Sequence, residues 1–410
     1  MRQSPATDAI VELVEHEERF VRLEPDEAEF LWRTYPRVLD VRMDGGGRSF
    51  VKVSSFVGSV MTPYRELRIK PKCPASSLFY MLGWAYGLAS LREEAVGYKD
   101  VESVWEFLVA LLIEGLERLV KRDLHRGYVE RERALPALRG RLLVEQHLRR
   151  MRPAELTLPC RFEELTPDTV HNQVVRFTLH QLPRPRSDLL GLRLHRLRSL
   201  FSFAHYRAFT PKDLGQIVYD RLSEHYRPVH SLCRLLLEGR GLDHPAGSYP
   251  LGAFLLDMNV LFERFVAGWL RENMSRPYSV ETQMSGHLDF GKRLRIRPDL
   301  VISRSGKIVL VADTKYKSMS SLSEGMQVIS SADAYQVVSY CRALGIARGA
   351  LIYPEWSGGP EVYRVRDGET SVTADGVDLG QSHFAIDRIM RRLCARLSQD
   401  HEPRGTRSRG

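Results

Sequence analysis

The chain has 410 residues, 43% of them hydrophobic, and a formal net charge of +9 at pH 7. This length can hold two or three domains, each with its own core. No run of about 18 uncharged apolar residues occurs, and residues 1–15 lack the apolar segment of a signal peptide, so neither a transmembrane helix nor secretion is expected. The positive charge favours a polyanionic partner such as a nucleic acid.

The five cysteines are widely spaced, without a C-x-x-C pair. We therefore expect reduced thiols in a cytoplasmic protein, without a structural zinc site. The cysteines are Cys73, Cys160, Cys233, Cys341 and Cys394.

Residues 1–72 are expected to form a β-rich N-terminal unit. Apolar and β-branched runs predict its strands, a short helix over Asp26–Tyr35 interrupts them, and Asp44–Gly47 has the composition of a hairpin turn. No Gly-Lys-Ser or Gly-Lys-Thr triplet follows the glycines, so the chain has no recognisable P-loop. The predicted strands are Phe20–Leu23, Val38–Arg42, Phe50–Val53 and the basic run Glu66–Lys72.

Residues 73–245 are expected to form a mainly helical middle domain. Leu78–Tyr86 and Val104–Leu119 carry apolar residues every three to four positions, which is typical of helices with one buried face. Between Arg184 and Arg207, basic residues recur among leucines and phenylalanines. This stripe either faces DNA or is a solvated helix face.

Residues 246–398 are expected to form an α/β domain around a central mixed sheet, followed by a disordered basic tail at 399–410. A helix is predicted over Leu251–Arg271, with Glu263 at the flank of its apolar stripe. A serine-rich loop is expected over Tyr316–Ser331. The remaining predicted elements are helices over Ala332–Leu344 and Phe384–Leu397 and strands over Gly349–Pro354 and Glu361–Arg366.

The chemistry is expected in a hairpin of two strands, Arg297–Ile302 and Ile308–Lys315. Antiparallel pairing brings Asp299 and Asp313 to the same end, and alternation points Asp313 and Lys315 to one face and Thr314 to the other. Two carboxylates beside an ammonium group suit Mg²⁺-dependent phosphodiester hydrolysis. An acid and a lysine that only solvate a strand end are the alternative.

Pro298-Asp299 followed by Asp313-Thr314-Lys315 resembles the pattern of the PD-(D/E)xK nuclease superfamily. With Asp257–Val266 upstream and Asp333–Tyr340 downstream, the chain resembles the McrC family, the nuclease subunit of McrBC-type restriction systems that attack DNA containing modified cytosine. The resemblance implies a C-terminal PD-(D/E)xK nuclease domain and a DNA endonuclease.

The resemblance also implies roles for individual residues. Asp299 and Asp313 would bind Mg²⁺, helped by the backbone carbonyl of Thr314, with Glu263 as a direct or water-mediated ligand. Lys315 would orient the attacking water or stabilise charge on the phosphate. Gln336 would position this lysine or a phosphate oxygen.

The partners that the resemblance implies are double-stranded DNA and a McrB-like AAA+ GTPase hexamer, which would bind the GTP, with residues 1–72 contributing to the GTPase contact. One alternative is a self-sufficient or differently partnered nuclease in defence or repair. Another is a DNA-binding adaptor with an inactive nuclease domain. The sequence does not identify the base modification, the motor, the number of metal ions or the oligomeric state.

Overall fold

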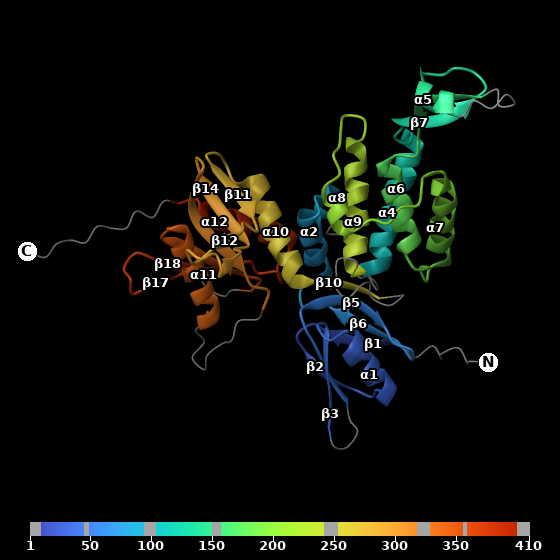
Figure 1. Cartoon of the computed structure of the whole chain (residues 1–410). Helices are drawn as coiled ribbons and strands as arrows, with labels where there is room; N and C mark the ends of the chain where they lie inside the picture. Colours follow the sequence, from blue (N-terminus) through green and yellow to red (C-terminus); the bar gives the residue numbers. More distant parts are fainter. Residues whose placement is uncertain are drawn as a thin grey trace, which may run out of the picture. The chain divides into compact units, whose positions relative to one another are not determined.

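The computed structural model describes residues 10–44, 49–93, 104–149, 157–241, 253–317, 329–355 and 359–399. The chain divides into two compact units, which are Met1–Glu102 together with Gly252–Gly410, and Ser103–Leu251. This division differs from the boundaries expected at residues 72 and 245. The N-terminal strands and the C-terminal α/β region belong to one unit, because strands from the two regions pair with each other (Figure 1).

The N-terminal part of the first unit is β-rich, as the sequence predicts. A three-stranded sheet has the order β2-β4-β3, and a four-stranded sheet has the order β1-β6-β5-β10. Strands β1 and β5 were not predicted, and residues 45–47 of the expected hairpin turn lie outside the described residues. The elements are β1 (Ile10–Val14), β2 (Glu18–Val21), α1 (Pro25–Thr34), β3 (Leu39–Met43), β4 (Ser49–Val53), β5 (Phe56–Met61) and β6 (Glu66–Lys70).

The helix expected over Leu251–Arg271 is shorter at its start, because strand β10 (Phe254–Asp257) precedes it. Three consecutive buried apolar residues, 254–256, suit a strand covered on both faces, and β10 pairs antiparallel with β5. Helix α10 (Met258–Asn273) then begins at Asp257, whose side chain accepts hydrogen bonds from the N–H groups of Asn259 and Val260. The chain therefore enters α10 directly from the N-terminal sheet.

Helix α2 (Ala75–Ala85), expected in the middle domain, lies in the first unit, followed by α3 (Ala89–Glu93). It packs closely on α10, because a Cβ atom on Gly268 would lie 2.6 Å from the carbonyl oxygen of Trp84. The rings of Trp84 and Trp269 are 6.0 Å apart. Both the β5–β10 pairing and this helix contact tie the N-terminal residues to the C-terminal region.

The C-terminal region contains the mixed sheet that the sequence predicts, with the strand order β11-β14-β15-β16-β18-β17. Pairs β15–β16 and β16–β18 are parallel, and the other pairs are antiparallel. Strands β11 and β18 were not predicted, and most of the expected serine-rich loop (318–328) and of the tail (400–410) lies outside the described residues. The elements are β11 (Tyr278–Thr282), β14 (Leu300–Arg304), β15 (Lys307–Thr314), α11 (Ser331–Leu344), β16 (Arg348–Tyr353), β17 (Glu361–Arg364), β18 (Ser371–Gly376) and α12 (His383–Leu397).

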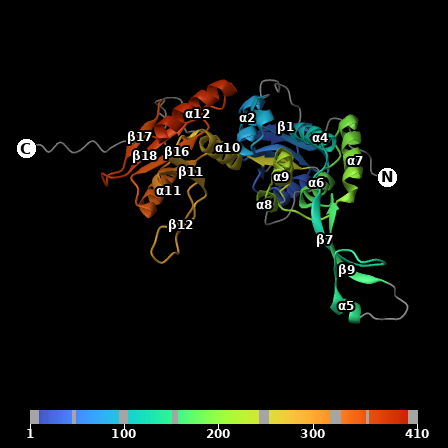
Figure 2. The same ribbon diagram turned by 90° about the horizontal axis from the view of Figure 1, so that it is seen from above.

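The second unit is mostly helical but contains a sheet of order β7-β9-β8 that the sequence analysis missed. Figures 1 and 2 both show the β7–β9 ribbon extending from the helices of this unit. Cross-strand ion pairs such as Arg161–Glu130 stabilise it where apolar burial is slight, which hides it from a search for buried strands. Its elements are α4 (Val104–Arg122), β7 (Gly127–Leu135), β8 (Arg141–Leu142), α5 (Val144–Arg149), β9 (Leu158–Thr166), α6 (Val170–Gln181), α7 (Asp188–Leu200), α8 (Pro211–Gly215) and α9 (Arg227–Gly239).

The basic stripe between Arg184 and Arg207 includes several arginines that stabilise the fold. Arg193 forms a two-point ion pair with Glu117 of α4, and Arg198 donates hydrogen bonds to the carbonyl groups of Leu179 and Leu182. These two arginines therefore hold the fold together, a role that neither expected interpretation, a DNA-facing stripe or a solvated helix face, includes. Across the part of the chain that the structure describes, no helix is both long and apolar enough to cross a membrane.

Candidate active site

The predicted hairpin is formed by β14 and β15, which pair antiparallel with Leu300 opposite Ala312. Its turn consists of Ser305 and Gly306, both with positive φ (49° and 80°), as in the two-residue turns that match strand twist. Asp299 directly precedes β14, and Asp313 is the penultimate residue of β15. The hairpin therefore places both carboxylates at the end opposite the turn, as predicted.

Thr314 binds Asp299 through two groups. The Asp299 Oδ2 atom accepts hydrogen bonds from the Thr314 N–H group and from the Thr314 hydroxyl group, both at 2.8 Å. Strand alternation alone does not predict the hydroxyl contact, because Asp299 lies just before the paired residues of β14. Thr314 thus orients the carboxylate of Asp299 with its backbone and with its side chain.

Lys315 lies between Asp313 and helix α11. Its Nζ atom forms an ion pair with Asp313 and donates a 2.8 Å hydrogen bond to Gln336 Oε1. The Gln336 amide in turn donates to the Tyr340 hydroxyl at 2.7 Å. The two residues that the sequence analysis paired, Lys315 and Gln336, are therefore in direct contact, with Tyr340 behind them.

Glu263 comes to the same site from α10. Its Oε1 atom accepts a 2.9 Å hydrogen bond from Gln283, and the Oε1 atom of Gln283 accepts one from Arg297. The sequence analysis missed Gln283 and the side chain of Arg297. The Pro298-Asp299 motif was the signal in the sequence that lay next to both residues. Arg297 directly precedes this motif, and the Gln283 N–H group donates a hydrogen bond to the carbonyl group of Asp299.

Two acids of the site, Asp313 and Glu263, have raised pKa values. Burial and the nearby Asp299 carboxylate raise the pKa of Asp313 to about 6, although Lys315 acts in the opposite direction. Asp313 is only 2% exposed. Burial and Asp299 also raise the pKa of Glu263. A divalent cation bound to these carboxylates would relieve their mutual repulsion.

The site lies in a cleft of about 280 Å³. The cleft is lined by Glu263, Arg297, Asp299, Asp313, Thr314, Lys315 and Gln336, together with Asn259, Val260, Tyr316 and Lys317. Among the described residues, no three His, Cys, Asp or Glu side chains are arranged to hold a metal ion. Glu263 therefore does not complete a ligand set with the two aspartates in this geometry. Mg²⁺ is commonly bound by one or two carboxylates and several waters, so Asp299 and Asp313 fit this ion as its protein ligands.

The chain directly after Lys315 is fixed by the N-terminal sheet. The buried Tyr316 hydroxyl donates a 2.8 Å hydrogen bond to Glu15 Oε1, which also accepts one from the Lys72 N–H group at 2.8 Å. The Tyr316 ring lies 5.9 Å from that of Phe262, the residue before Glu263. Tyr316, which follows β15 closely, therefore contacts both Glu15 in the N-terminal region and Phe262 of α10.

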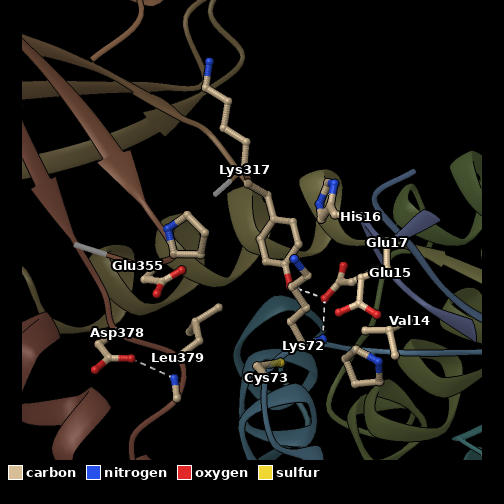
Figure 3. Close-up of a pocket in the computed structure, with 14 residues that line it drawn as sticks. Val14, Glu15, His16, Glu17, Lys72, Cys73, Lys317, Glu355, Asp378 and Leu379 are labelled. Atoms are coloured by element: carbon tan, nitrogen blue, oxygen red, sulfur yellow. Dashed lines mark hydrogen bonds between the residues drawn. The ribbon is translucent and has the colours of Figure 1, made fainter. Parts of the chain in front are cut away.

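A second cavity, of about 500 Å³, lies beside Tyr316. Figure 3 shows Glu15, His16 and Lys72 on one side of it and Glu355, Asp378 and Leu379 on the other. Burial raises the pKa of Glu15 and lowers that of His16. The hydrogen bonds from Tyr316 and Lys72 partly offset the cost of burying the Glu15 carboxylate.

Known proteins resemble this chain along most of its length. A family model described as the McrBC 5-methylcytosine restriction system component matches residues 51–354. The type IV methyl-directed restriction enzyme EcoKMcrBC of Escherichia coli (strain K12) is 24% identical over 306 residues, which cover 70% of this chain and 87% of that protein.

A solved structure is similar as well. It is a refined half-complex from a tetradecameric assembly of Thermococcus gammatolerans McrB AAA+ hexamers with bound McrC. The TM-score is 0.60 at 21% identity, and the match covers 94% of this chain and 100% of that one, which shows a shared fold. Because the family model spans well over half of its residues, the chain belongs to the McrBC 5-methylcytosine restriction system component family, as its McrC-like motifs predicted.

Proposed function

We propose that this chain is the Mg²⁺-dependent DNA endonuclease of a McrBC-type restriction system. Its C-terminal region would be a PD-(D/E)xK nuclease domain that hydrolyses phosphodiester bonds of DNA containing modified cytosine, in the cytoplasm. A McrB-like AAA+ GTPase would bind GTP and act with it. The observation that carries the proposal is the convergence of Asp299, Asp313 and Lys315 at one cleft, with Gln336 holding the lysine.

Each residue would contribute in a way that its contacts support. Asp299, oriented by Thr314, and the buried Asp313 would hold Mg²⁺, with the Thr314 carbonyl group as a further oxygen ligand. A bound Mg²⁺ supplies Lewis acidity and positive charge for phosphodiester hydrolysis. Lys315 would place its ammonium group beside the scissile phosphate or orient the attacking water, and Gln336 keeps it in the cleft.

Glu263 would act at the edge of this site. In this geometry it is held by Gln283 instead of joining the two aspartates. We assign it a water-mediated contact with the metal, or general-base assistance to the attacking water, because burial and Asp299 raise the pKa of its carboxyl group and so make its carboxylate a stronger base.

The test is cleavage of methylated and unmethylated plasmid in Mg²⁺, with and without a McrB-like GTPase and GTP. Cleavage confined to methylated DNA in the complete reaction supports the proposal. Asp313→Asn and Lys315→Ala should each lower the rate by about 100-fold or more, whereas Asp40→Asn, a surface carboxylate on β3, should retain it.

The other outcomes decide between the alternatives. Cleavage by the chain alone, independent of methylation, would overturn the partner and the modified base but leave the nuclease. No cleavage in any reaction, together with binding to DNA, would favour an adaptor with an inactive domain.

A further inference from the structure

A short two-stranded hairpin lies next to the candidate site and is formed by β12 (Gly286–His287) and β13 (Arg295–Ile296). Strand β11 pairs with β14 up to Thr282 and Leu300, and the next contact joins Gln283 to the Asp299 carbonyl group. The same two chain segments pair again as β12 and β13. The hairpin thus continues the β11–β14 ribbon beyond Asp299, and Figure 2 shows it extending from the six-stranded sheet.

The tip of this hairpin is exposed and apolar. Phe290 is fully exposed, Leu294 is 58% exposed and Leu288 is 41% exposed. Apolar side chains that stay in water at a hairpin tip do not stabilise the fold by burial. Their exposure is explained if another surface covers them on binding.

The same tip is basic. Lys292, Arg293 and Arg295 are exposed, and none of the side chains that the structure describes forms an ion pair with them. The one acid of the tip is Asp289, and its Oδ1 atom accepts hydrogen bonds from the N–H groups of Arg293 and Leu294 at 2.9 and 2.7 Å. The acid therefore shapes the turn, and three cations face solvent.

Backbone hydrogen bonds support the shape of the tip. Besides the two bonds to Asp289, the Leu288 N–H group binds the Leu294 carbonyl group at 2.8 Å, and the Lys292 N–H group binds the Asp289 carbonyl group at 3.2 Å. Arg297, which directly follows β13 (Arg295–Ile296), lines the candidate active site. The cationic tip is therefore connected to the cleft by a short, paired ribbon.

We infer that the β12–β13 hairpin is a DNA-binding element that grips the duplex beside the scissile phosphate, with Lys292, Arg293 and Arg295 on phosphates and Phe290 against the bases. This inference rests on the proposed function. Cations matched to phosphates position a protein on DNA, and exposed apolar side chains wedge between or stack on bases. The combination of both at one tip favours DNA over a second protein chain.

The experiment measures binding of the full chain to a labelled duplex at several salt concentrations, with Ca²⁺ in place of Mg²⁺ to prevent cleavage. The triple variant Lys292→Ala, Arg293→Ala, Arg295→Ala should lower the slope of log affinity against log salt by about two to three, close to one for each phosphate that the protein no longer neutralises. Phe290→Ala should weaken binding about fivefold to a hundredfold without changing that slope, and Phe290→Tyr should restore it.

The matched control is the triple variant Lys307→Ala, Arg364→Ala, Arg366→Ala. It removes the same charge from two other places. Lys307 lies next to the turn between β14 and β15, and Arg364 and Arg366 lie at the β17 edge of the six-stranded sheet. This variant should bind as the wild type does. Asp313→Asn should bind DNA but not cleave it.

Three results would overturn the inference. Equal slopes and affinities in the hairpin variants, with wild-type binding and cleavage intact, would remove the hairpin's role and leave the nuclease. A change in molecular mass by light scattering with Phe290→Ala, while DNA binding stays as in the wild type, would assign the tip to contact with a second copy of the chain. A wild-type chain that does not bind DNA, and that does not cut methylated DNA in the complete reaction with the GTPase and GTP, would overturn the proposed function as well.

Discussion

Replacing Asp313 with asparagine should stabilise the metal-free protein at neutral and alkaline pH. The wild-type carboxyl group is buried beside Asp299, and its pKa lies at about 6, above the ordinary value of 3.8. This difference corresponds to ~3 kcal/mol of unfavourable interaction for the ionised form. Asparagine keeps the shape without the charge, but it removes the counter-ion of Lys315. We therefore expect a net gain of about 1–3 kcal/mol at pH 8.

The direction of the pH dependence follows from the raised pKa. The contribution of Asp313 to stability is fully present below about pH 4 and is lost as the pH rises through about 6. The difference between the variant and the wild type should therefore open between pH 4 and pH 7. Mg²⁺ should reverse the order, because it stabilises the wild type by about 2.7 kcal/mol at 100 times its dissociation constant, and the variant lacks a ligand.

The assay is urea unfolding of both proteins at pH 4.5 and pH 8, with and without Mg²⁺, with Asp40→Asn as the surface control. A variant that is less stable than the wild type at pH 8, and that responds equally to Mg²⁺, would refute the reasoning. It would mean that Asp313 is stabilised by Lys315 more than it is destabilised by burial and by Asp299.

Three further predictions concern the supports of the site and of the fold. Tyr316→Phe keeps the ring beside Phe262 but removes the donor to Glu15, and should lower the free energy of unfolding by about 1–3 kcal/mol in urea; no change would mean that Glu15 finds another donor. Gly58→Ala should destabilise by at least about 1–3 kcal/mol, because φ is +138° and the new Cβ would lie 2.0 Å from the Phe254 carbonyl oxygen, whereas Gly359→Ala meets no atom within 4 Å and should be nearly neutral in thermal unfolding. Burial lowers the pKa of His171 to about 4 and of His230 to about 3, so the stability that these neutral rings provide is complete above about pH 6.5 and is lost as the pH falls below it. His230→Asn should reduce the slope of unfolding free energy against pH between 6.5 and 4, and the exposed His195→Gln should leave that slope as in the wild type.

Local sequence patterns determined much of the C-terminal region. The β14–β15 hairpin was predictable because two apolar runs flank a turn, and this pairing alone brings Asp299 and Asp313 to one end. Helix α11 has a regular apolar spacing, so the placement of Gln336 beside the hairpin followed once its role was suggested by resemblance. These features depend on neighbours within about twenty residues.

Only the tertiary structure decided the contacts between distant segments. Strand β10 appeared to be the start of a helix because its apolar run lacks the alternation of a half-buried strand, and only its pairing with β5 defines it. The Glu15–Tyr316 hydrogen bond joins residues 301 positions apart, and no local pattern predicts it. The β7–β9 ribbon was missed for the opposite reason, because β7 is rich in charged residues and has no fully buried position.

Local sequence thus specifies the β14–β15 hairpin, whereas the surroundings of the candidate site depend on the whole fold. Turn chemistry and strand periodicity act over a few residues, so they can be recognised in one sequence. The raised pKa of Asp313 depends instead on burial by residues from several elements, and the grouping of the N-terminal sheet with the C-terminal region depends on β10 and α2. Desolvation and long-range packing are properties of the assembled fold, which is why the sequence predicted the residues of the site but not the environment that surrounds them.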